Sequence, residues 1–325
     1  MSWRSPIAVV VLFLLSTLAG ADAESYPARP VTIVVPYAAG GGIDVIARLL
    51  AQRLTEDLGE SFVVENRLGA GGVIASSFVA RAPADGYTLL LASDAQFAIQ
   101  VPLRKHLPYD PVKDFAPIGI AGSTPFALLV NPSVPASSLR EFIALAESKP
   151  GDMAFGSSGV GSTPHLVMEM FSRMSGTRLR HIPYKGTAQA LNDLIGGTIP
   201  VMFSGLTGVP GLLAAGKVRA LGISSRSRLK ILPSVPTIAE AGLPGFEAMG
   251  FVILAAPAGT PTSIVDLLYA ELNKIKERPD VEQKYDTIGY VVDRSPPPQD
   301  VARFIEKQIG VWTDVVAKAG LSHSQ

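Results

Sequence analysis

The chain has 325 residues, of which 47% are hydrophobic and 17% charged, with 28 basic and 28 acidic side chains. This neutral balance, without a cluster of Lys and Arg, argues against a nucleic acid or an anionic membrane surface as partner. Cysteine is absent, so the chain has neither a disulfide framework nor a cysteine for a lipid anchor. About 300 residues behind an N-terminal leader are long for one core, and we expect two domains.

The N-terminal segment has the pattern of an export signal. Arg4 provides a positive start, residues 7–18 form an apolar stretch, and residues 21–23 read Ala-Asp-Ala, a small-residue cleavage site. The alternative is a membrane anchor, but the apolar stretch is too short to span the roughly 30 Å core of a bilayer. The sequence therefore predicts a signal peptide over residues 1–23, cleaved after Ala23, and a protein released into the periplasm.

The first predicted element behind the leader is a buried strand over residues 31–35. It ends in the glycine-rich turn Pro-Tyr-Ala-Ala-Gly-Gly-Gly-Ile-Asp at residues 36–44, and an amphipathic helix follows up to Gly59. Glycines let the backbone approach a ligand, and the free N–H groups of a helix start attract anions. We expect that a side chain at Gly41 would crowd the ligand or force the backbone out of its permitted region.

Strands and helices alternate along most of the remaining chain. Short apolar runs with amphipathic segments between them are typical of βα units, which build parallel sheets covered by helices. The predicted fold class is therefore α/β. The expected strands are 62–65, 87–91, 153–155, 179–182, 199–203, 218–223 and 251–255, and the expected helices are those ending at 80, beginning at 164, and spanning 189–195, 263–277 and 300–319.

Two segments are candidates for crossings between domains, residues 117–125 and 246–251. If the chain crosses at both, the first and last thirds share one domain, 24–122 plus 248–325, and the middle third, 123–247, forms the other. Ligands of open α/β sheets bind beyond the carboxyl ends of the strands, so a cleft between two such domains would gather several loops.

A second glycine-rich loop, Gly-Ser-Ser-Gly-Val-Gly-Ser-Thr-Pro at residues 156–164, lies between a predicted strand and a predicted helix. Thr163 fits the N-cap position and Pro164 the first helical turn. This is again an anion-binding arrangement, now rich in hydroxyl groups, and two such helix starts on opposing domains would suit a ligand with two separated carboxylates. The alternative is that each loop is only a tight turn.

Catalytic and metal-binding patterns are incomplete. Residues 211–217 nearly match a phosphate-binding P-loop, but Val218 replaces the required Ser or Thr. Val160 replaces the last glycine of a G-x-S-x-G nucleophile turn. The four His residues show no metal-ligand spacing, and no string supplies a nucleophile with its base and orienting group. We therefore expect a protein that is not an enzyme, with no cofactor and no metal, and His165 has either a structural role or a hydrogen bond to the ligand.

Eight collinear segments carry a resemblance to a known family. They are VVPYAAGGGIDVIARLLAQRL, VENRLGAGG, APADGYTLLL, LPYDPVKDFAPI, SSGVGSTPHL, IPYKGTAQALNDLIGG, AGKVRALGISS and VPTIAEAGLPGFE. From Tyr26 to about Leu321 the chain resembles the substrate-binding receptors of tripartite tricarboxylate transporters, the Bug or TctC-like family. The resemblance implies two Rossmann-like domains of the type II periplasmic binding protein kind, a cleft that closes by hinge motion, a bound carboxylate, and the membrane subunits of the transporter as partners.

In this family the loop that matches residues 37–43 holds one ligand carboxylate, largely through backbone groups and ordered waters. The segment that matches residues 157–165 engages the ligand from the other domain. Three positions depart from the family pattern: Ile43 stands where Thr or Ser is frequent, Asp94 lies in a loop that is often Ser/Gly-rich, and Ser204 replaces an Asp of some relatives. Asp94 would repel a carboxylate or accept a hydrogen bond from an amine, hydroxyl or amide of the ligand; alternatively it is a solvated or helix-capping residue.

The sequence thus predicts a periplasmic solute-binding protein, expected to be a monomer, that captures a small carboxylate for a tripartite tricarboxylate-type transporter. The ligand is expected to be a di- or tricarboxylate, or an aromatic or amide-bearing acid. Two alternatives are an exported α/β hydrolase acting on an anionic ester and a ligand sensor for a membrane signalling protein. The candidate ligand-binding residues are Tyr37, Ala38, Gly40, Gly41, Gly42, Ile43, Ser93, Asp94, Ser157, Ser158, Ser162, Thr163, His165, Tyr184 and Ser204.

Overall fold

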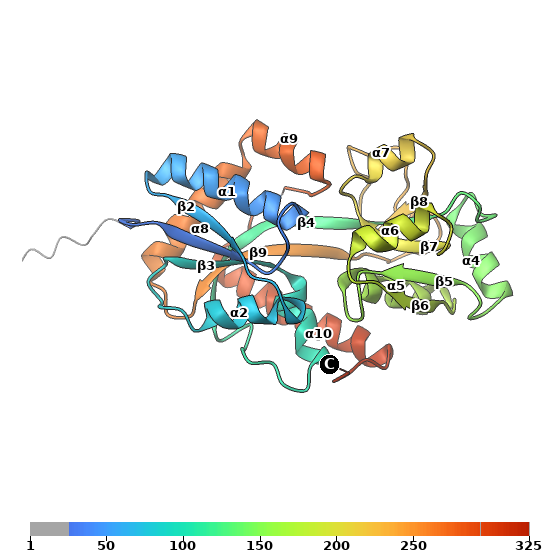
Figure 1. The fold of residues 1–325 in the computed structure, drawn as a ribbon, viewed down its shortest axis with the longest axis horizontal. Helices are drawn as coiled ribbons and strands as arrows, with labels where there is room; N and C mark the ends of the chain where they lie inside the picture. Colours follow the sequence, from blue (N-terminus) through green and yellow to red (C-terminus); the bar gives the residue numbers. More distant parts are fainter. Residues whose placement is uncertain (1–25, 293, 325) are drawn as a thin grey trace, which may run out of the picture.

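The computed structural model describes residues 26–292 and 294–324. The predicted signal peptide over residues 1–23 lies outside the described residues. Within them, no helix combines the length and the apolar character needed to cross a membrane. The chain forms two α/β lobes that lie side by side and are joined by long strands (Figure 1).

The strands of both lobes belong to one continuous sheet. Among the described residues it has nine strands in the order β2-β1-β3-β9-β4-β7-β5-β6, and β8 pairs with β4. The strands of the first lobe are β1 (Val31–Val35), β2 (Phe62–Asn66), β3 (Thr88–Ser93) and β9 (Met249–Pro257). The strands of the second lobe are β5 (Ala154–Ser157), β6 (Arg180–Pro183), β7 (Val201–Gly205) and β8 (Arg219–Ile223), and β4 (Phe115–Val130) serves both.

The first lobe is built around the parallel pairing of β1 with β2 and β3, with β9 antiparallel to β3. The predicted helix behind the glycine-rich turn is present: it buries Ile46, Leu50 and Leu54 on one face, and Gly59 ends it in the left-handed conformation. Burial of this face against the sheet fixes the start of the helix at the edge of the lobe. The helices here are α1 (Gly42–Leu58), η2 (Ala70–Gly72), α2 (Val73–Ala80), η3 (Ala95–Ile99), α3 (Gln100–Leu103), α8 (Thr262–Lys276) and α9 (Pro279–Ile288).

The second lobe repeats this layout around β5, which pairs in parallel with β6 and β7, while β4 is antiparallel to β7 and β8. Its core is aromatic: the Phe171 ring meets the Phe203 ring edge-on at a centroid distance of 5.9 Å, and Phe203 stacks on Phe246 at 6.0 Å. Its helices are α4 (Leu139–Ser148), α5 (Thr163–Ser175), α6 (Thr187–Ile195) and α7 (Val209–Ala214).

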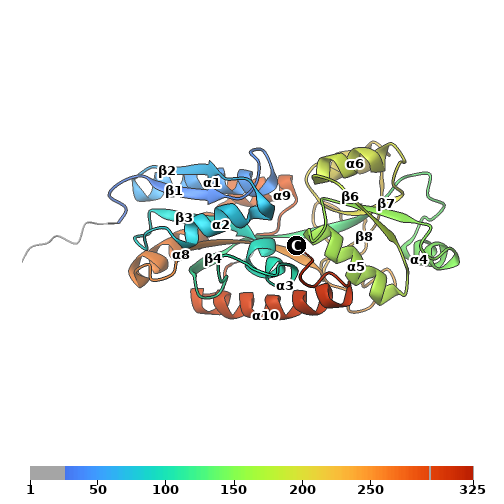
Figure 2. The ribbon, with the colours of Figure 1, turned by 60° about the horizontal axis from the view of Figure 1, so that its bottom comes forward.

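Three elements connect the lobes: β4, β9 and the long helix α10 (Pro298–Lys318). The residue before β9, Ala248, still donates to Ser224 O of the second lobe. β4 pairs with β9 as far as Pro125 and with β7 and β8 from there on. Helix α10 runs beneath the first lobe, and its C-terminal end reaches the second lobe near α5 (Figure 2). Its Ile305 packs in the core of the first lobe, whereas its Trp312 packs with the core of the second. The lobes are therefore linked along one side only, by two strands and a helix.

The α/β fold class is confirmed, and most predicted strands and helices are present. The pattern missed β4, α4, α7 and α9, and the short helices η2, η3 and α3. β4 was missed because Pro117 and Pro125 read as loop punctuation; the strand accommodates Pro117 by a shift of register against β9. The sheet also contains more antiparallel pairs than a βα repeat predicts. One boundary matters for function: α6 begins at Thr187, two residues before the predicted start.

Candidate ligand-binding cleft

A cavity of about 470 Å³ lies between the two lobes and receives loops from both. From the first lobe come the β1–α1 turn, the end of β3 and the start of β9. From the second come the starts of α5 and α6 and the end of β7. The lining residues are Tyr37, Gly41, Gly42, Ile43, Ser93, Asp94, Thr124, Phe126, Ser158, Thr163, Pro164, Thr187, Ala188, Leu191, Ser204, Gly205, Thr207, Gly250, Phe251, Val252 and Tyr290.

The start of α1 presents free backbone donors to this cavity. The first amides of a helix have no acceptor within it, and the N-cap, Gly41, has no side chain to supply one, so the amides of Gly42 and Ile43 are left for a ligand. The Gly40 amide is already engaged, because it donates to Asp44 Oδ2 over 2.9 Å. Arg48 Nε donates to the same oxygen, also over 2.9 Å. Asp44 therefore braces the turn and leaves the next two amides for a ligand.

The charge state of Asp44 fits this bracing role. Burial of its carboxyl raises the pKa, but hydrogen bonds from Arg48, the Gly40 amide and Asn66 outweigh this effect and hold the pKa of Asp44 below its usual value. The carboxylate is thus ionised at neutral pH and stays paired with its own helix and loop. An ionised acid at a helix start is stabilised by the helix dipole. Its charge is directed at the loop and does not carry acid–base chemistry.

The three consecutive glycines have different roles. Gly40 has φ 85°, a left-handed conformation that favours glycine, whereas Gly41 has φ −73°, which any residue adopts. The expectation that a side chain at Gly41 would force the backbone out of its permitted region is therefore wrong. A Cβ there would meet only Ala38 O at 3.5 Å, whereas a Cβ at Gly42 would come within 2.6 Å of the Tyr290 ring. A side chain introduced at Gly41 would therefore affect binding through the space that it occupies in the cleft.

The second lobe contributes two further helix starts. Ser162, and not Thr163, is the N-cap of α5, and its hydroxyl donates to Gly159 O over 2.7 Å instead of capping the helix. Gly186 is the N-cap of α6 and has no side chain to offer. Thr163 and Thr187, the first residues of the two helices, line the cavity. Three helix N-termini with their partial positive charges therefore converge on one space.

The described lining contains no Lys, Arg or His side chain. An anion bound there would be held by backbone amides, helix dipoles and hydroxyl groups. The cavity also has an apolar wall, formed by Ile43, Phe126, Leu191, Phe251 and Val252. Such a mixture of apolar surface and a few convergent polar groups is typical of small-molecule sites.

Asp94 is the one acidic side chain among the described residues that line the cavity. It lies at the end of β3, is 3% exposed, lines the cavity, and has an Oδ2 atom without a hydrogen-bond partner among the described residues. It occupies the N-cap position of η3 but makes no capping bond. Burial raises the pKa of the Asp94 carboxyl to about 7, against hydrogen bonds from Ser93 and from the backbone that lower it. Beside it, Tyr37 Oη lies 2.6 Å from Ser93 Oγ and donates to Gln96 Oε1 over 2.8 Å.

The structure brings most of the predicted site residues to this cavity. Those that line it are Tyr37, Gly41, Gly42, Ile43, Ser93, Asp94, Ser158, Thr163 and Ser204. The predicted residues outside the lining are Ala38, Gly40, Ser157, Ser162, His165 and Tyr184.

Several of these outer residues support the loops. Ser157 is fully buried and its Oγ lies 2.6 Å from His181 Nε2. His165 Nδ1 accepts a hydrogen bond from the Gly161 amide over 3.0 Å, which fits the structural role considered for it. Tyr184 donates to Asp193 over 2.6 Å. These contacts hold the second glycine-rich loop and the approach to α6 in place behind the cavity.

Sequence reasoning missed several residues of the lining. Thr187 and Ala188 carried a usable signal, a glycine directly before a polar helix start, but the helix was placed two residues too late. Thr124 and Phe126 lie in the unpredicted strand β4, and Thr207 follows β7 without a motif. Tyr290 lies after α9, and nothing in the sequence around it marks a site. Its pKa is raised, chiefly by burial and also by its nearness to Tyr37 and Asp94.

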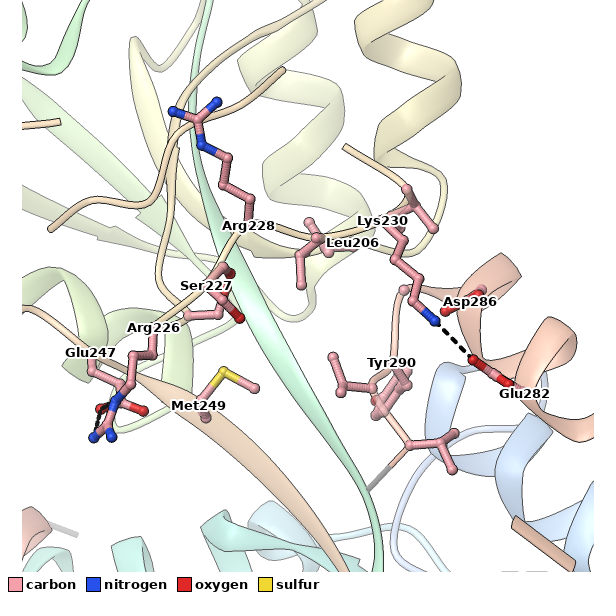
Figure 3. Close-up of a pocket in the computed structure, with 16 residues that line it drawn as sticks. Leu206, Arg226, Ser227, Arg228, Lys230, Glu247, Met249, Glu282, Asp286 and Tyr290 are labelled. Atoms are coloured by element: carbon pink, nitrogen blue, oxygen red, sulfur yellow. Dashed lines mark hydrogen bonds and ion pairs between the residues drawn. The ribbon is translucent and has the colours of Figure 1, made fainter. Parts of the chain in front are cut away.

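Tyr290 also lines a second cavity of about 360 Å³, here called the outer cavity (Figure 3). Three basic side chains reach this outer cavity, and each has an acidic partner. Arg226 pairs with Glu247 at 2.8 Å, Arg228 with Glu240 at 2.8 Å, and Lys230 with Glu282 at 3.0 Å. An anion that enters the outer cavity would therefore compete with an acidic side chain for each of these cations. Within residues 26–292 and 294–324, no group of three or more His, Asp or Glu side chains is placed to hold a metal ion.

Two α/β lobes, joined by strands and enclosing a cavity at the ends of several strands and helices, define a solute-binding protein of the periplasmic type. Within that class, residues 46–321 match the family described as "Tripartite tricarboxylate transporter family receptor", and the chain belongs to this family. The expected family and fold are thereby confirmed.

Individual relatives agree with this assignment. The chain is 37% identical to the protein BugT of Bordetella pertussis over 317 residues, which cover 97% of each chain. Among solved structures it is similar to Rpa4515 of R. palustris with adipate, at 38% identity and a TM-score of 0.83, covering 91% of this chain and 99% of that one. It is also similar to MatC of Rhodopseudomonas palustris with bound malate, at 35% identity and a TM-score of 0.79, covering 90% of this chain and all of the other.

Proposed function

We propose that this protein is a periplasmic receptor that captures a small carboxylate in the cleft and presents it to the membrane subunits of a tripartite tricarboxylate-type transporter. The observation that carries the proposal is the convergence of three uncapped helix starts on a cavity whose described lining has no basic side chain. Such helix starts bind anions without a cationic partner. Adipate and malate, the acids named for the two similar structures, are both dicarboxylates and support this ligand class.

A ligand with two carboxylates suits the arrangement best. The start of α1 belongs to one lobe and the starts of α5 and α6 belong to the other, so each carboxylate would have its own set of donors. Direct contact is assigned to the predicted residues that line the cavity, and to Thr187 beside them. The predicted residues outside the lining are assigned a supporting role for the loops.

The domain division fits a receptor that closes on its ligand. One domain would comprise residues 24–122 and 248–325 and the other residues 123–247, with β4 and β9 as the crossing strands. A small acid can touch donors of both lobes only when the lobes are close, so binding favours the closed state by the difference in its affinity for the two states. The protein would act as a monomer and would leave its ligand unchanged.

A thermal-shift screen of the mature protein tests this function. The screen contains mono-, di- and tricarboxylates, aromatic acids, and the uncharged amides of the same acids. A group of carboxylates should raise the melting temperature, since a ligand at 100 times its Kd adds about 2.7 kcal/mol to the free energy of unfolding. Calorimetry should then give one site per chain. The proposal is wrong if no carboxylate binds, or if uncharged amides bind as tightly as the acids.

A further inference from the structure

Asp94 places a single acidic side chain in a cavity otherwise arranged for anions. It is the only Asp or Glu among the described residues that line the cavity, and it is 3% exposed. Its Oδ2 atom has no hydrogen-bond partner among the described residues. A buried carboxyl oxygen without a donor costs free energy, and a ligand donor that reaches it removes this cost.

The hydroxyls of Tyr37 and Ser93 lie next to each other, and neither donates to Asp94 Oδ2. Tyr37 Oη donates to Gln96 Oε1 over 2.8 Å, and Ser93 Oγ lies 2.6 Å from Tyr37 Oη while accepting from the Ala95 amide over 3.1 Å. This network holds the Asp94 backbone in place at the end of β3. It also leaves Oδ2 for a group that comes from outside the protein.

The two halves of the cavity therefore require different chemistry of one ligand. At the starts of α1, α5 and α6 the cavity favours negative charge, whereas at Asp94 it favours a donor and opposes a second negative charge. An acid without an N–H or O–H group next to Asp94 would leave Oδ2 unpaired, and its own carboxylate would be repelled if it were placed there.

We propose that Asp94 determines the specificity of the cleft by accepting a hydrogen bond from an N–H or O–H group of the bound acid. The cleft then selects amino, amide or hydroxy acids over acids of the same length that lack such a group. This inference rests on the proposed carboxylate-binding function and narrows its ligand class. The donor is common to all three kinds of acid, and the experiment below separates them.

Matched acids provide the probes. Succinate, with both carboxylates ionised, has no hydrogen-bond donor. Malate adds a hydroxyl and aspartate an ammonium, while in succinamate an amide replaces one carboxylate; adipate and 2-aminoadipate form a longer pair. Calorimetric titration of the mature protein with each acid gives the ratio of Kd values within a series. For at least one donor-bearing acid, the Kd should be about tenfold or more below that of its donor-free counterpart, as for a hydrogen bond to a charged group.

Two variants then test whether Asp94 is responsible. Asp94→Ala should abolish the preference for the donor-bearing acid and leave the Kd of the donor-free acid equal or lower. Asp94→Asn keeps an acceptor but loses the charge, so it should keep most of the preference for a hydroxyl or amide and lose that for an ammonium. The matched control is Asp266→Asn, the same change at an exposed position of α8, which should alter neither Kd. Melting curves without ligand check that each variant is folded.

The outcomes separate this inference from the function on which it rests. If no acid of either kind binds, the receptor function itself fails. If donor-free acids bind as tightly as their donor-bearing counterparts, or if Asp94→Ala leaves the ratio unchanged, only the role of Asp94 is wrong.

Discussion

Ser157 and His181 are joined by a hydrogen bond of 2.6 Å between Oγ and Nε2, on the buried side of the second glycine-rich loop. The His165 ring stacks on the His181 ring at a centroid distance of 3.8 Å, and the Phe155 ring stacks on the His181 ring at 4.8 Å. A serine beside a histidine is the arrangement that a hydrolase would need. Here the serine is fully buried and absent from the cavity lining, so the pair positions the loop.

We predict that bound ligand is not converted. Burial and the neighbouring His165 lower the pKa of His181 to about 4, which makes its imidazole a weak general base at neutral pH. A substoichiometric amount of the protein should be incubated with an acid that it binds and, separately, with the methyl ester of that acid. Mass spectrometry should recover both unchanged. Conversion beyond one equivalent that disappears in Ser157→Ala would establish the hydrolase alternative instead.

The same histidine predicts a pH dependence of stability. Its pKa is lowered from 6.5 to about 4 in the folded protein, so the unfolded chain binds a proton on His181 between these values while the folded chain does not. The contribution to the free energy of unfolding is complete above pH 6.5 and is lost as the pH falls towards 4. His181→Phe, which keeps an aromatic ring against His165, should flatten this slope.

The comparison must be made as a difference between variant and wild type. Asp94 acts in the opposite direction, because its pKa is raised from 3.8 to about 7 and its contribution to stability is lost as the pH rises through that range. Urea unfolding of both proteins at pH 4, 5, 6 and 7 measures the effect. An equal pH dependence in the two proteins would show that His181 titrates normally.

Gly41→Val is expected to weaken ligand binding by about tenfold or more while leaving the fold intact. The backbone at Gly41 suits any residue and a Cβ there meets only Ala38 O at 3.5 Å, so the new side chain enters the space next to the free amides of Gly42 and Ile43. Calorimetry and circular dichroism check the two halves of this prediction. Gly310→Val, at a position of α10 with nothing within 4 Å of its Cβ, is the matched control. An unchanged Kd in Gly41→Val would show that the first glycine-rich loop is only a turn and does not contact the ligand.

The buried strands and α1 could be predicted because their side chains follow the periodicity of a sheet covered by helices. The glycine-rich loops could be predicted because a turn that brings a backbone close to a ligand requires glycine at positions such as Gly40, with φ 85°. Tyr290 and Thr207 could not be predicted. Each reaches the cavity through tertiary packing, Tyr290 against Gly42 and Thr207 through a 2.9 Å hydrogen bond to Ile288 O, and local sequence does not encode such pairings.

The long strand β4 also could not be predicted from local sequence. Its Pro117 and Pro125 are residues that a single sequence assigns to loops, and only pairing with β9 on one side and with β7 and β8 farther along makes the segment a strand. Thr124 and Phe126 therefore reach the cleft from an element that local propensity opposes.

Lobe closure is expected when ligand binds. The connections lie along one side, through β4, β9 and α10, and the Thr207 hydrogen bond to Ile288 O already joins the lobes at one edge of the cavity. Small-angle scattering should show a smaller radius of gyration at saturating ligand. If calorimetry confirms binding and the scattering profile stays the same, the cleft is closed before the ligand arrives or one lobe binds alone.

The central claim is that helix starts from both lobes hold the carboxylates of a small acid in this cleft. A crystal structure with the acid that gives the largest thermal shift tests it most directly. We predict one carboxylate within about 2.7–3.2 Å of the amides of Gly42 or Ile43 and the other at the same distance from donors of Thr163 or Thr187. An acid bound in the outer cavity beside Lys230, or held by one lobe without any of these amides, would contradict the account.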